Sequence, residues 1–261
     1  MTYPIAEYFH SIQGEGFHTG VPMLFLRLAG CNVGRYEMPE PKTHPIHQHA
    51  DLPLIESKKH SFCTTFAGQA FLCDTDYHKV DSKSENELVA LLEGERHVCV
   101  TGGEPFLHNL TPLVLAMQEA GVVVHIETSG TLPLVFPPDT DVRVPKDQPF
   151  ETDLTPETLG CAGIIKRHML WITCSPKAGY LPEVLADVNE IKILVGPRFI
   201  QSWLEKFLEQ VPVQLMDRVY LSPINGVEKA SNDSLDICLH LLRVLPSLKL
   251  SAQLHKYIGQ R

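Results

Sequence analysis

Three of the seven cysteines in this sequence are placed where they could hold an iron–sulfur cluster. Cys31 directly follows an apolar segment that predicts a β-strand, and Cys63 and Cys73 lie ten residues apart further along the chain. A [4Fe–4S] cluster takes four thiolates, so three would leave one iron open to a small molecule. The compact arrangement Cys-x-x-x-Cys-x-x-Cys is absent, and ordinary buried thiols are the alternative interpretation.

The segment Thr101-Gly-Gly-Glu-Pro105 has the composition of a ligand-binding turn. Glycines let a ligand approach the backbone closely because they carry no Cβ atom, and the Glu104 carboxylate could accept a hydrogen bond from a cationic amino group. A tight strand-to-helix turn without a ligand explains the same residues. Arg27 offers a planar fork of donors that suits a carboxylate, and its alternative role is a structural ion pair.

Parallel strands are the elements that would bring these residues together. Six apolar segments and a last extended piece predict strands that alternate with helices, as in β-α units around a parallel sheet. They are residues 23–28, 97–101, 122–127, 170–174, 190–195, 218–221 and 248–253. Polar or glycine-rich residues follow five of them, at 30–31, 102–105, 128–130, 175–177 and 222–225. Such loops share one rim of a parallel α/β barrel, so we expect a pocket there.

Helix signals fall between the predicted strands. Ser84 and Glu87 form a capping box. Thr111-Pro112 predicts the N-cap and first turn of a helix that stops at Gly121. Apolar residues at helical spacing predict two more helices, over 199–210 and over 234–244, the latter ended by Pro246.

Length and composition indicate one domain over residues 1–261, with a large core. Two segments without periodicity, at about 32–61 and 132–160, are expected to be insertions. The formal charge of −9 and the lack of basic clusters argue against a nucleic-acid partner. We find neither a signal peptide nor an apolar run long enough to span a membrane, so we expect no membrane partner, a cytoplasmic location and no disulfides.

Several motifs together resemble the 7-carboxy-7-deazaguanine synthases, a family of radical S-adenosylmethionine (SAM) enzymes. In chain order they are Ser11-Ile-Gln-Gly-Glu-Gly16, Phe25-Leu-Arg-Leu-Ala-Gly-Cys-Asn32, Cys73-Asp-Thr75, Thr101-Gly-Gly-Glu-Pro105, Glu127-Thr-Ser-Gly130, Ser175-Pro-Lys177 and Gln253-Leu-His-Lys-Tyr257. The Gly-Gly-Glu-Pro stretch occurs in many radical SAM enzymes. Cys-Asp-Thr, Ser-Pro-Lys and the C-terminal Gln-x-His-Lys are more selective, and the match runs from residue 3 to residue 261 apart from the two insertions.

The resemblance implies an α/β fold, a partial TIM-like radical SAM barrel of about six parallel strands with a reduced set of helices. It implies a carbon–nitrogen lyase that contracts 6-carboxy-5,6,7,8-tetrahydropterin to 7-carboxy-7-deazaguanine with loss of ammonia, for queuosine in tRNA and other 7-deazapurines. The implied cofactors are a [4Fe–4S] cluster, SAM and Mg²⁺. The implied partners are a second copy of the chain in a homodimer and an electron donor such as flavodoxin.

The matched motifs also imply roles for individual residues. The implied cluster ligands are Cys31 and Cys73, and Thr75 matches the threonine that touches Mg²⁺. The substrate contacts are Ile12, Gln13, Gly14, Glu15, Arg27, Thr101, His255 and the terminal carboxylate of Arg261. The SAM contacts are Leu72, Asp74, Gly103, Glu104, Ser175, Pro176, Lys177, Ser222, Pro223, Ile224 and Asn225.

The sequence departs from the family at the middle cluster cysteine. The family has it three residues before the Cys-Asp-Thr cysteine, where this chain has Ala70. Cys63 is the nearest replacement, and because long loops close at modest entropic cost it can reach the cluster, with residues 64–70 bulging out. The rival ligand is a histidine from residues 44–49 or His60, since imidazole replaces thiolate in Rieske centres. Core or structural roles are expected for Cys99, Cys161, Cys174 and Cys238.

Two other functions fit parts of the pattern. Another radical SAM reaction, such as activation of a glycyl-radical enzyme, would use the same scaffold, but the Ser-Pro-Lys and Gln-x-His-Lys motifs argue against it. A non-catalytic relative that binds a metal or a pterin would explain Ala70. A zinc-binding module is disfavoured because Cys-x-x-Cys knuckles are lacking.

Overall fold

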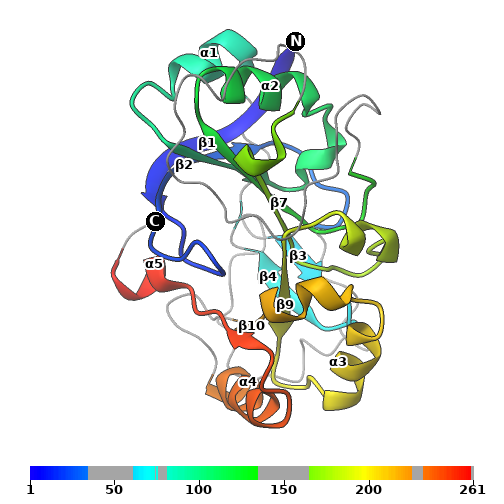
Figure 1. The fold of residues 1–261 in the computed structure, drawn as a ribbon. Helices are drawn as coiled ribbons and strands as arrows, with labels where there is room; N and C mark the ends of the chain where they lie inside the picture. The colour runs from blue at the N-terminus through cyan, green and yellow to red at the C-terminus, as the bar shows by residue number, and fades with distance from the viewer. Residues whose placement is uncertain (35–60, 74, 76–80, 135–164, 225–231, 260–261) are drawn as a thin grey trace.

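One nine-stranded sheet organises the computed structural model (Figure 1). The structure describes residues 1–34, 61–73, 75, 81–134, 165–224 and 232–259. In chain order its strands are β1 (Thr2–Ile12), β2 (Pro22–Leu28), β5 (Asp81–Ser84), β6 (His97–Gly102), β7 (Val123–Thr128), β8 (Leu170–Cys174), β9 (Glu190–Val195), β10 (Val219–Pro223) and β11 (Lys249–Leu250). They lie in the order β11-β10-β9-β8-β7-β6-β2-β1-β5, so the sheet has two edges and does not close on itself.

In the part of the sheet from β11 to β2, each pair of adjacent strands is parallel. They are the strands expected from the apolar segments, although β11 is shorter than the extended piece predicted over 248–253. Few helices cover this open, mostly parallel sheet. The expected fold class, an incomplete barrel of about six parallel strands with a reduced set of helices, is therefore confirmed.

Strands β1 and β5 extend the sheet beyond the predicted set. Strand β1 pairs antiparallel with β2 on one side and with β5 on the other. Its pairing with β2 shifts register between Ile5 and Glu7, which interrupts the apolar alternation that identifies a strand in sequence. Strand β5 has the sequence Asp-Ser-Lys-Ser, which is typical of an exposed edge and carries no apolar signal.

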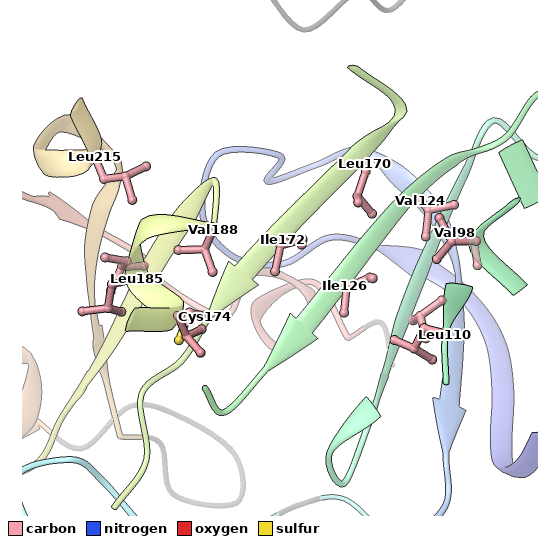
Figure 2. Packing of buried hydrophobic residues seen from close by; sticks show 14 of the residues in the cluster. Val98, Leu110, Val124, Ile126, Leu170, Ile172, Cys174, Leu185, Val188 and Leu215 are labelled. Carbon is pink, nitrogen blue, oxygen red and sulfur yellow. The ribbon is translucent and has the colours of Figure 1, made fainter. Parts of the chain in front are cut away.

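The parallel strands place alternate residues on opposite faces of the sheet. One face packs into the main apolar core. Figure 2 shows Ile126 of β7 and Ile172 of β8 in this core together with Leu185 and Val188 from the segment after β8. The alternate residues of each strand point to the opposite, concave face of the sheet, where β7 presents His125 and Glu127. Polar side chains on the concave side are thus held by strands whose other face is anchored in the core.

Two short helices follow the predicted signals closely. Helix α1 (Glu85–Ala90) begins with the expected capping box between Ser84 and Glu87. Helix α2 (Thr111–Glu119) begins one residue earlier than predicted, because its N-cap is Leu110 and not Thr111. The Thr111 amide donates to the Asn109 side chain at 3.2 Å, so asparagine supplies the acceptor that threonine was expected to supply. The predicted stop at Gly121 is confirmed by its φ of +81°.

The remaining helices lie in the C-terminal part of the chain. Helix α3 (Gln201–Leu208) is shorter than the predicted span of 199–210, since Ile200 is extended and precedes the first turn. Helix α4 (Asn232–Val244) ends as expected before Pro246, and α5 (Leu254–Tyr257) is a single turn. Within the described residues, no helix combines the length and the apolar character that crossing a membrane requires.

A hairpin separate from the main sheet carries two of the candidate cluster cysteines. Strands β3 (Ser61–Thr64) and β4 (Ala70–Cys73) pair antiparallel. Residues 64–70 do not form a separate bulge as predicted. Thr64 ends β3, residues 65–69 form a tight turn, and Ala70 begins β4. The Thr65 amide donates to the Gln69 carbonyl at 2.8 Å and closes this turn. The ring of Phe66 at its tip packs 4.6 Å from that of Phe207 in α3, which ties the hairpin to the body of the protein.

Candidate functional site

A pocket of about 250 Å³ opens at the carboxyl ends of the parallel strands. Its wall also includes the segment after β1 and helix α5. Seventeen of the predicted site residues line it: Ile12, Gln13, Gly14, Glu15, Arg27, Cys31, Cys63, Cys73, Thr75, Thr101, Gly103, Ser175, Lys177, Ser222, Pro223, Ile224 and His255. The topology therefore brings together residues that are more than 200 positions apart in the chain.

Other predicted site residues are placed elsewhere. Glu104 and Pro176 lie next to wall residues but do not line the pocket. Asp74, Asn225 and Arg261 lie outside the described residues, as does the side chain of Leu72. The rival histidines at 44–49 and at 60 also fall outside them, and so does Cys161.

The three candidate cluster thiols line the pocket and lie close enough to affect one another's pKa. In the hairpin, Cys63 pairs with Phe71 and Ser61 pairs with Cys73. The two cysteines are thus diagonal neighbours on one face, and such neighbours are roughly 7–8 Å apart. Cys31 approaches from the loop after β2. The hairpin thus places Cys63 next to Cys73, although the two are ten residues apart in the sequence.

Burial raises the pKa of the Cys31 and Cys63 thiols, and local donors and charges oppose this effect. The Cys31 sulfur accepts hydrogen bonds from the amides of Val33 at 3.4 Å and Gly34 at 3.2 Å. Burial raises the pKa of the Cys63 thiol to about 11, and the ammonium group of Lys177 acts in the opposite direction. A buried thiol with a raised pKa is held as a thiolate when it binds a metal, because the metal replaces its proton.

Gly102 and Gly103 permit a close approach of two loops. Gly102 has a φ of +139°, and a Cβ atom there would lie 2.2 Å from the Leu28 carbonyl oxygen. A Cβ atom at Gly103 would lie 2.0 Å from the carbonyl oxygen of Gly30 and 2.6 Å from the Cβ atom of Cys31. Both glycines are therefore required to pack the turn after β6 against the loop that carries Cys31.

The carboxylate of Glu104 is fully buried and ties this turn to the loop after β7. One oxygen accepts from the Thr128 hydroxyl at 2.9 Å and from the Phe106 amide at 3.1 Å. The other accepts from the Ser129 amide at 2.8 Å and from the Ser129 hydroxyl. In this structure the chain itself supplies four donors to Glu104, which therefore shapes the pocket wall from behind.

Arg27 and Thr75 form a second polar group on the wall. Arg27 donates from Nη1 to the Thr75 hydroxyl at 2.8 Å, and its Nε lies 3.0 Å from a Glu7 carboxylate oxygen. A hydroxyl oxygen has two lone pairs, so Thr75 keeps one for another ligand. The guanidinium is thus partly neutralised by Glu7 while it still faces the pocket.

A buried ionic network crosses the floor of the pocket. Lys192 lies 2.5 Å from a Glu15 carboxylate oxygen and 3.9 Å from one of Glu127. The other oxygen of Glu15 accepts from the Ser222 hydroxyl at 3.1 Å. Glu127 accepts from Gln13 at 3.2 Å and, on its other oxygen, from Thr101 at 3.2 Å. Three of the residues expected from the sequence as substrate contacts, Gln13, Glu15 and Thr101, are therefore members of one network of hydrogen bonds and ion pairs.

Glu127 and Lys192 were not among the predicted site residues. Glu127 belongs to a quoted motif, and Lys192 is a charged residue inside the apolar strand Glu190–Val195. A charged residue in a buried parallel strand needs a partner, and this is the signal that could have identified Lys192. Burial favours the neutral amine of Lys192 and would lower its pKa. The carboxylates of Glu15 and Glu127 outweigh this effect and raise the pKa of Lys192.

Helix α5 closes the pocket from the C-terminal side. The Leu254 amide donates to the Gly14 carbonyl at 2.9 Å, which joins α5 to the segment after β1. A Cβ atom at Gly14 would lie 1.9 Å from Nδ1 of His255, so these two residues are in direct contact. The predicted substrate contacts from the two ends of the chain thus form one corner of the wall.

The other described cysteines lie outside the pocket, as expected. Cys99, Cys174 and Cys238 are fully buried. No three His, Cys, Asp or Glu side chains among the described residues are arranged to hold a single metal ion. A cluster makes a different demand, because each thiolate binds a separate iron of the cluster.

Comparisons with known proteins give relatives of full length. The chain is 31% identical to the 7-carboxy-7-deazaguanine synthase of Escherichia coli, over 99% of this chain and 99% of that protein. It is 28% identical to the synthase of the same name from Synechocystis, over 100% and 95% of the two chains. The crystal structure of QueE from Escherichia coli superposes with a TM-score of 0.62 at 26% identity, covering 98% of this chain and 95% of that one. No protein-family model matches the sequence.

Proposed function

Because the chain belongs to the 7-carboxy-7-deazaguanine synthase family, we propose that its pocket holds an iron–sulfur cluster, SAM and a pterin side by side. The chain is a radical SAM lyase of queuosine biosynthesis. Its reaction is the ring contraction of 6-carboxy-5,6,7,8-tetrahydropterin to 7-carboxy-7-deazaguanine with loss of ammonia. The proposal assigns the three components to different parts of the wall.

We assign the cluster to Cys31, Cys63 and Cys73. Convergence of these three thiols in the pocket is the observation that carries the proposal. The amide donors at Cys31 and the ammonium of Lys177 suit sulfur atoms that carry negative charge. When bound, the cluster would supply the electron for reductive cleavage of SAM.

SAM would lie against the turn after β6 and the loops after β8 and β10. These supply Gly103, Ser175, Lys177 and residues 222–224 to the wall. Lys177 donates to the Ser175 hydroxyl at 2.9 Å, which orients both side chains. Glu104 holds the turn in place through its buried hydrogen bonds, and backbone atoms at Gly103 are left open to a ligand.

The pterin would lie between Arg27 and the network on the pocket floor. The Arg27 fork suits the substrate carboxylate, while Gln13 and Glu15 face the ring and His255 closes the corner. Thr75 has a free lone pair for Mg²⁺, whose remaining ligands would include substrate oxygens. The motif match assigns the terminal carboxylate of Arg261 to the pterin side of the pocket. The same resemblance implies a homodimer and a flavodoxin-like electron donor.

The test is the iron and sulfide content of anaerobically reconstituted protein, measured for wild type, Cys63→Ala and Cys238→Ala. We expect roughly four irons per chain for wild type and for Cys238→Ala, whose thiol is buried in α4 away from the pocket. We expect Cys63→Ala to lose the cluster. A Cys63→Ala protein that keeps its irons would assign the third ligand to another residue, such as a histidine. A wild type without a cluster would refute the proposed chemistry and leave a pterin- or metal-binding protein.

A further inference from the structure

Lys192 is a buried cation on the floor of the pocket, and the motif matches give it no role. We propose that Lys192 is a positioning residue, which holds Glu15 and Glu127 as a pair of ionised hydrogen-bond acceptors for the N–H groups of the pterin ring. This inference rests on the proposed function, because it takes the pterin as the ligand of the pocket. It adds to that function a residue that determines how the ring is recognised.

The position of Lys192 follows from the sheet. It lies on β9 opposite Tyr220 of β10, with its side chain on the concave face between those of Glu190 and Leu194. Its strand neighbours Ile191 and Ile193 are fully buried in the main core on the other face. The ammonium group is therefore held in place by a rigid strand.

The contacts of Lys192 join two parts of the wall that are far apart in sequence. It pairs with Glu15, from the segment after β1, at 2.5 Å and with Glu127, from β7, at 3.9 Å. Both carboxylates line the pocket. Ser222 donates to Glu15, and Gln13 and Thr101 donate to Glu127. Each carboxylate is thus oriented by neighbours that donate hydrogen bonds, with Lys192 between the two.

Charge is the reason that this arrangement depends on Lys192. Two buried carboxylates that face one pocket repel each other, and burial favours a proton on one of them. The ionisable groups that interact with Lys192 or with its two partners include Glu15, Glu127, Glu190, Arg27, Lys177 and Cys99. Burial would raise the pKa of Glu127, but Lys192, Gln13 and Arg27 outweigh it and lower this pKa. Without Lys192, burial is expected to raise the pKa of Glu127, so that this carboxylate takes up a proton more readily.

A proton on either carboxylate changes what the pocket can recognise. An ionised carboxylate only accepts hydrogen bonds, whereas a protonated one also donates. The 2-amino group and ring N–H groups of a pterin are donors, and they need acceptors opposite them. Loss of Lys192 should therefore weaken pterin binding and make it depend on pH. SAM binding should be affected less, because Lys192 is joined to the proposed SAM site through Glu15 and Ser222.

The experiment is anaerobic calorimetry on reconstituted holoenzyme without reductant, with the tetrahydropterin substrate and with SAM as separate ligands, at pH 6.5, 7.5 and 8.5. The variants are Lys192→Met, Lys192→Gln and Lys192→Arg. The control is Lys249→Met, which removes an exposed lysine from the neighbouring part of the sheet. We expect Lys192→Met and Lys192→Gln to raise the substrate Kd about tenfold or more. Their substrate Kd should be higher at pH 6.5 than at 8.5, because the added proton is lost as pH rises.

The controls separate positioning from a general structural role. Lys192→Arg keeps the charge and should restore most of the affinity and the flat pH profile, and Lys249→Met should behave as wild type. Lys192→Gln keeps a polar donor and provides the test if Lys192→Met does not fold. If the neutral variants bind the pterin as wild type does at all three pH values, the inference about Lys192 is overturned and the proposed function still stands. A wild type that does not bind the pterin would overturn the proposed function and this inference with it.

Discussion

Replacing Glu104 should destabilise the protein even when the replacement has the same shape. The carboxylate is fully buried and accepts four hydrogen bonds, two on each oxygen. Each oxygen receives one bond from a backbone amide, that of Phe106 or that of Ser129. In Glu104→Gln, either orientation of the side-chain amide places its NH₂ group against one of these backbone N–H groups. Flipping the amide cannot remove this donor–donor contact.

The magnitude follows from the donors that lose their acceptor. The Thr128 and Ser129 hydroxyls can rotate, and Ser129 already lies 2.8 Å from the Thr131 hydroxyl, so we assign them little cost. A backbone amide that loses an acceptor in the interior costs about 1–3 kcal/mol. We therefore expect Glu104→Gln to lower the free energy of unfolding by about 2–3 kcal/mol, with one amide affected. Glu104→Ala, with both affected, should lower it by about 3–5 kcal/mol.

Urea unfolding, followed by circular dichroism under anaerobic conditions, measures both values. Glu119→Gln is the matched control, because Glu119 is exposed at the end of α2 and its loss should change stability by less than about 0.5 kcal/mol. A Glu104→Gln protein as stable as this control would refute the reasoning, since it would mean that the buried amides of Phe106 and Ser129 find other acceptors.

Two further predictions concern Glu190 of β9 and Gly14 of the pocket wall. Burial raises the pKa of Glu190 to about 7, so between about pH 4.5 and 7 the folded protein keeps a proton that the unfolded chain has lost. The stability of wild type should fall by up to about 3 kcal/mol as pH rises through this window, and Glu190→Gln should remove most of this fall in urea unfolding at pH 5 and pH 8. Gly14→Ala places a Cβ atom 1.9 Å from His255 and should displace α5. We expect a substrate KM raised about tenfold with little change in melting temperature, and an unchanged KM would show that α5 does not form part of the substrate site.

Local sequence signals were sufficient for most of the sheet and for the helix ends. Most residues of a buried parallel strand are apolar, so β8 and β9 were predicted to the residue, although β9 also carries Glu190 and Lys192. Strand β1 was not predicted, because its pairing shifts register at Ile5 and its alternation is broken. The start of α2 was misplaced by one residue, because Asn109 and Thr111 are both suitable caps and only the path of the chain selects between them.

The hairpin that carries Cys63 and Cys73 shows where local reasoning ends. Because these cysteines lie ten residues apart, residues 64–70 were expected to bulge out. The structure has two paired strands there, with Phe66 packed on Phe207 more than 140 residues away. Pairing depends on register, and the anchor depends on a distant helix, so neither is encoded by the spacing of two cysteines.

The sequence by itself determined the order of the strands along the chain and the motifs at their ends, which depend on residue type and on short spacings. The family resemblance that these motifs carry implied seventeen residues of the pocket wall. The tertiary structure decided which charges meet. Glu15, Glu127 and Lys192 come from three separate elements, and their distances depend on how the strands lie side by side. Ionic contacts in a buried site depend on distances of a few ångströms, and only the folded sheet sets those distances.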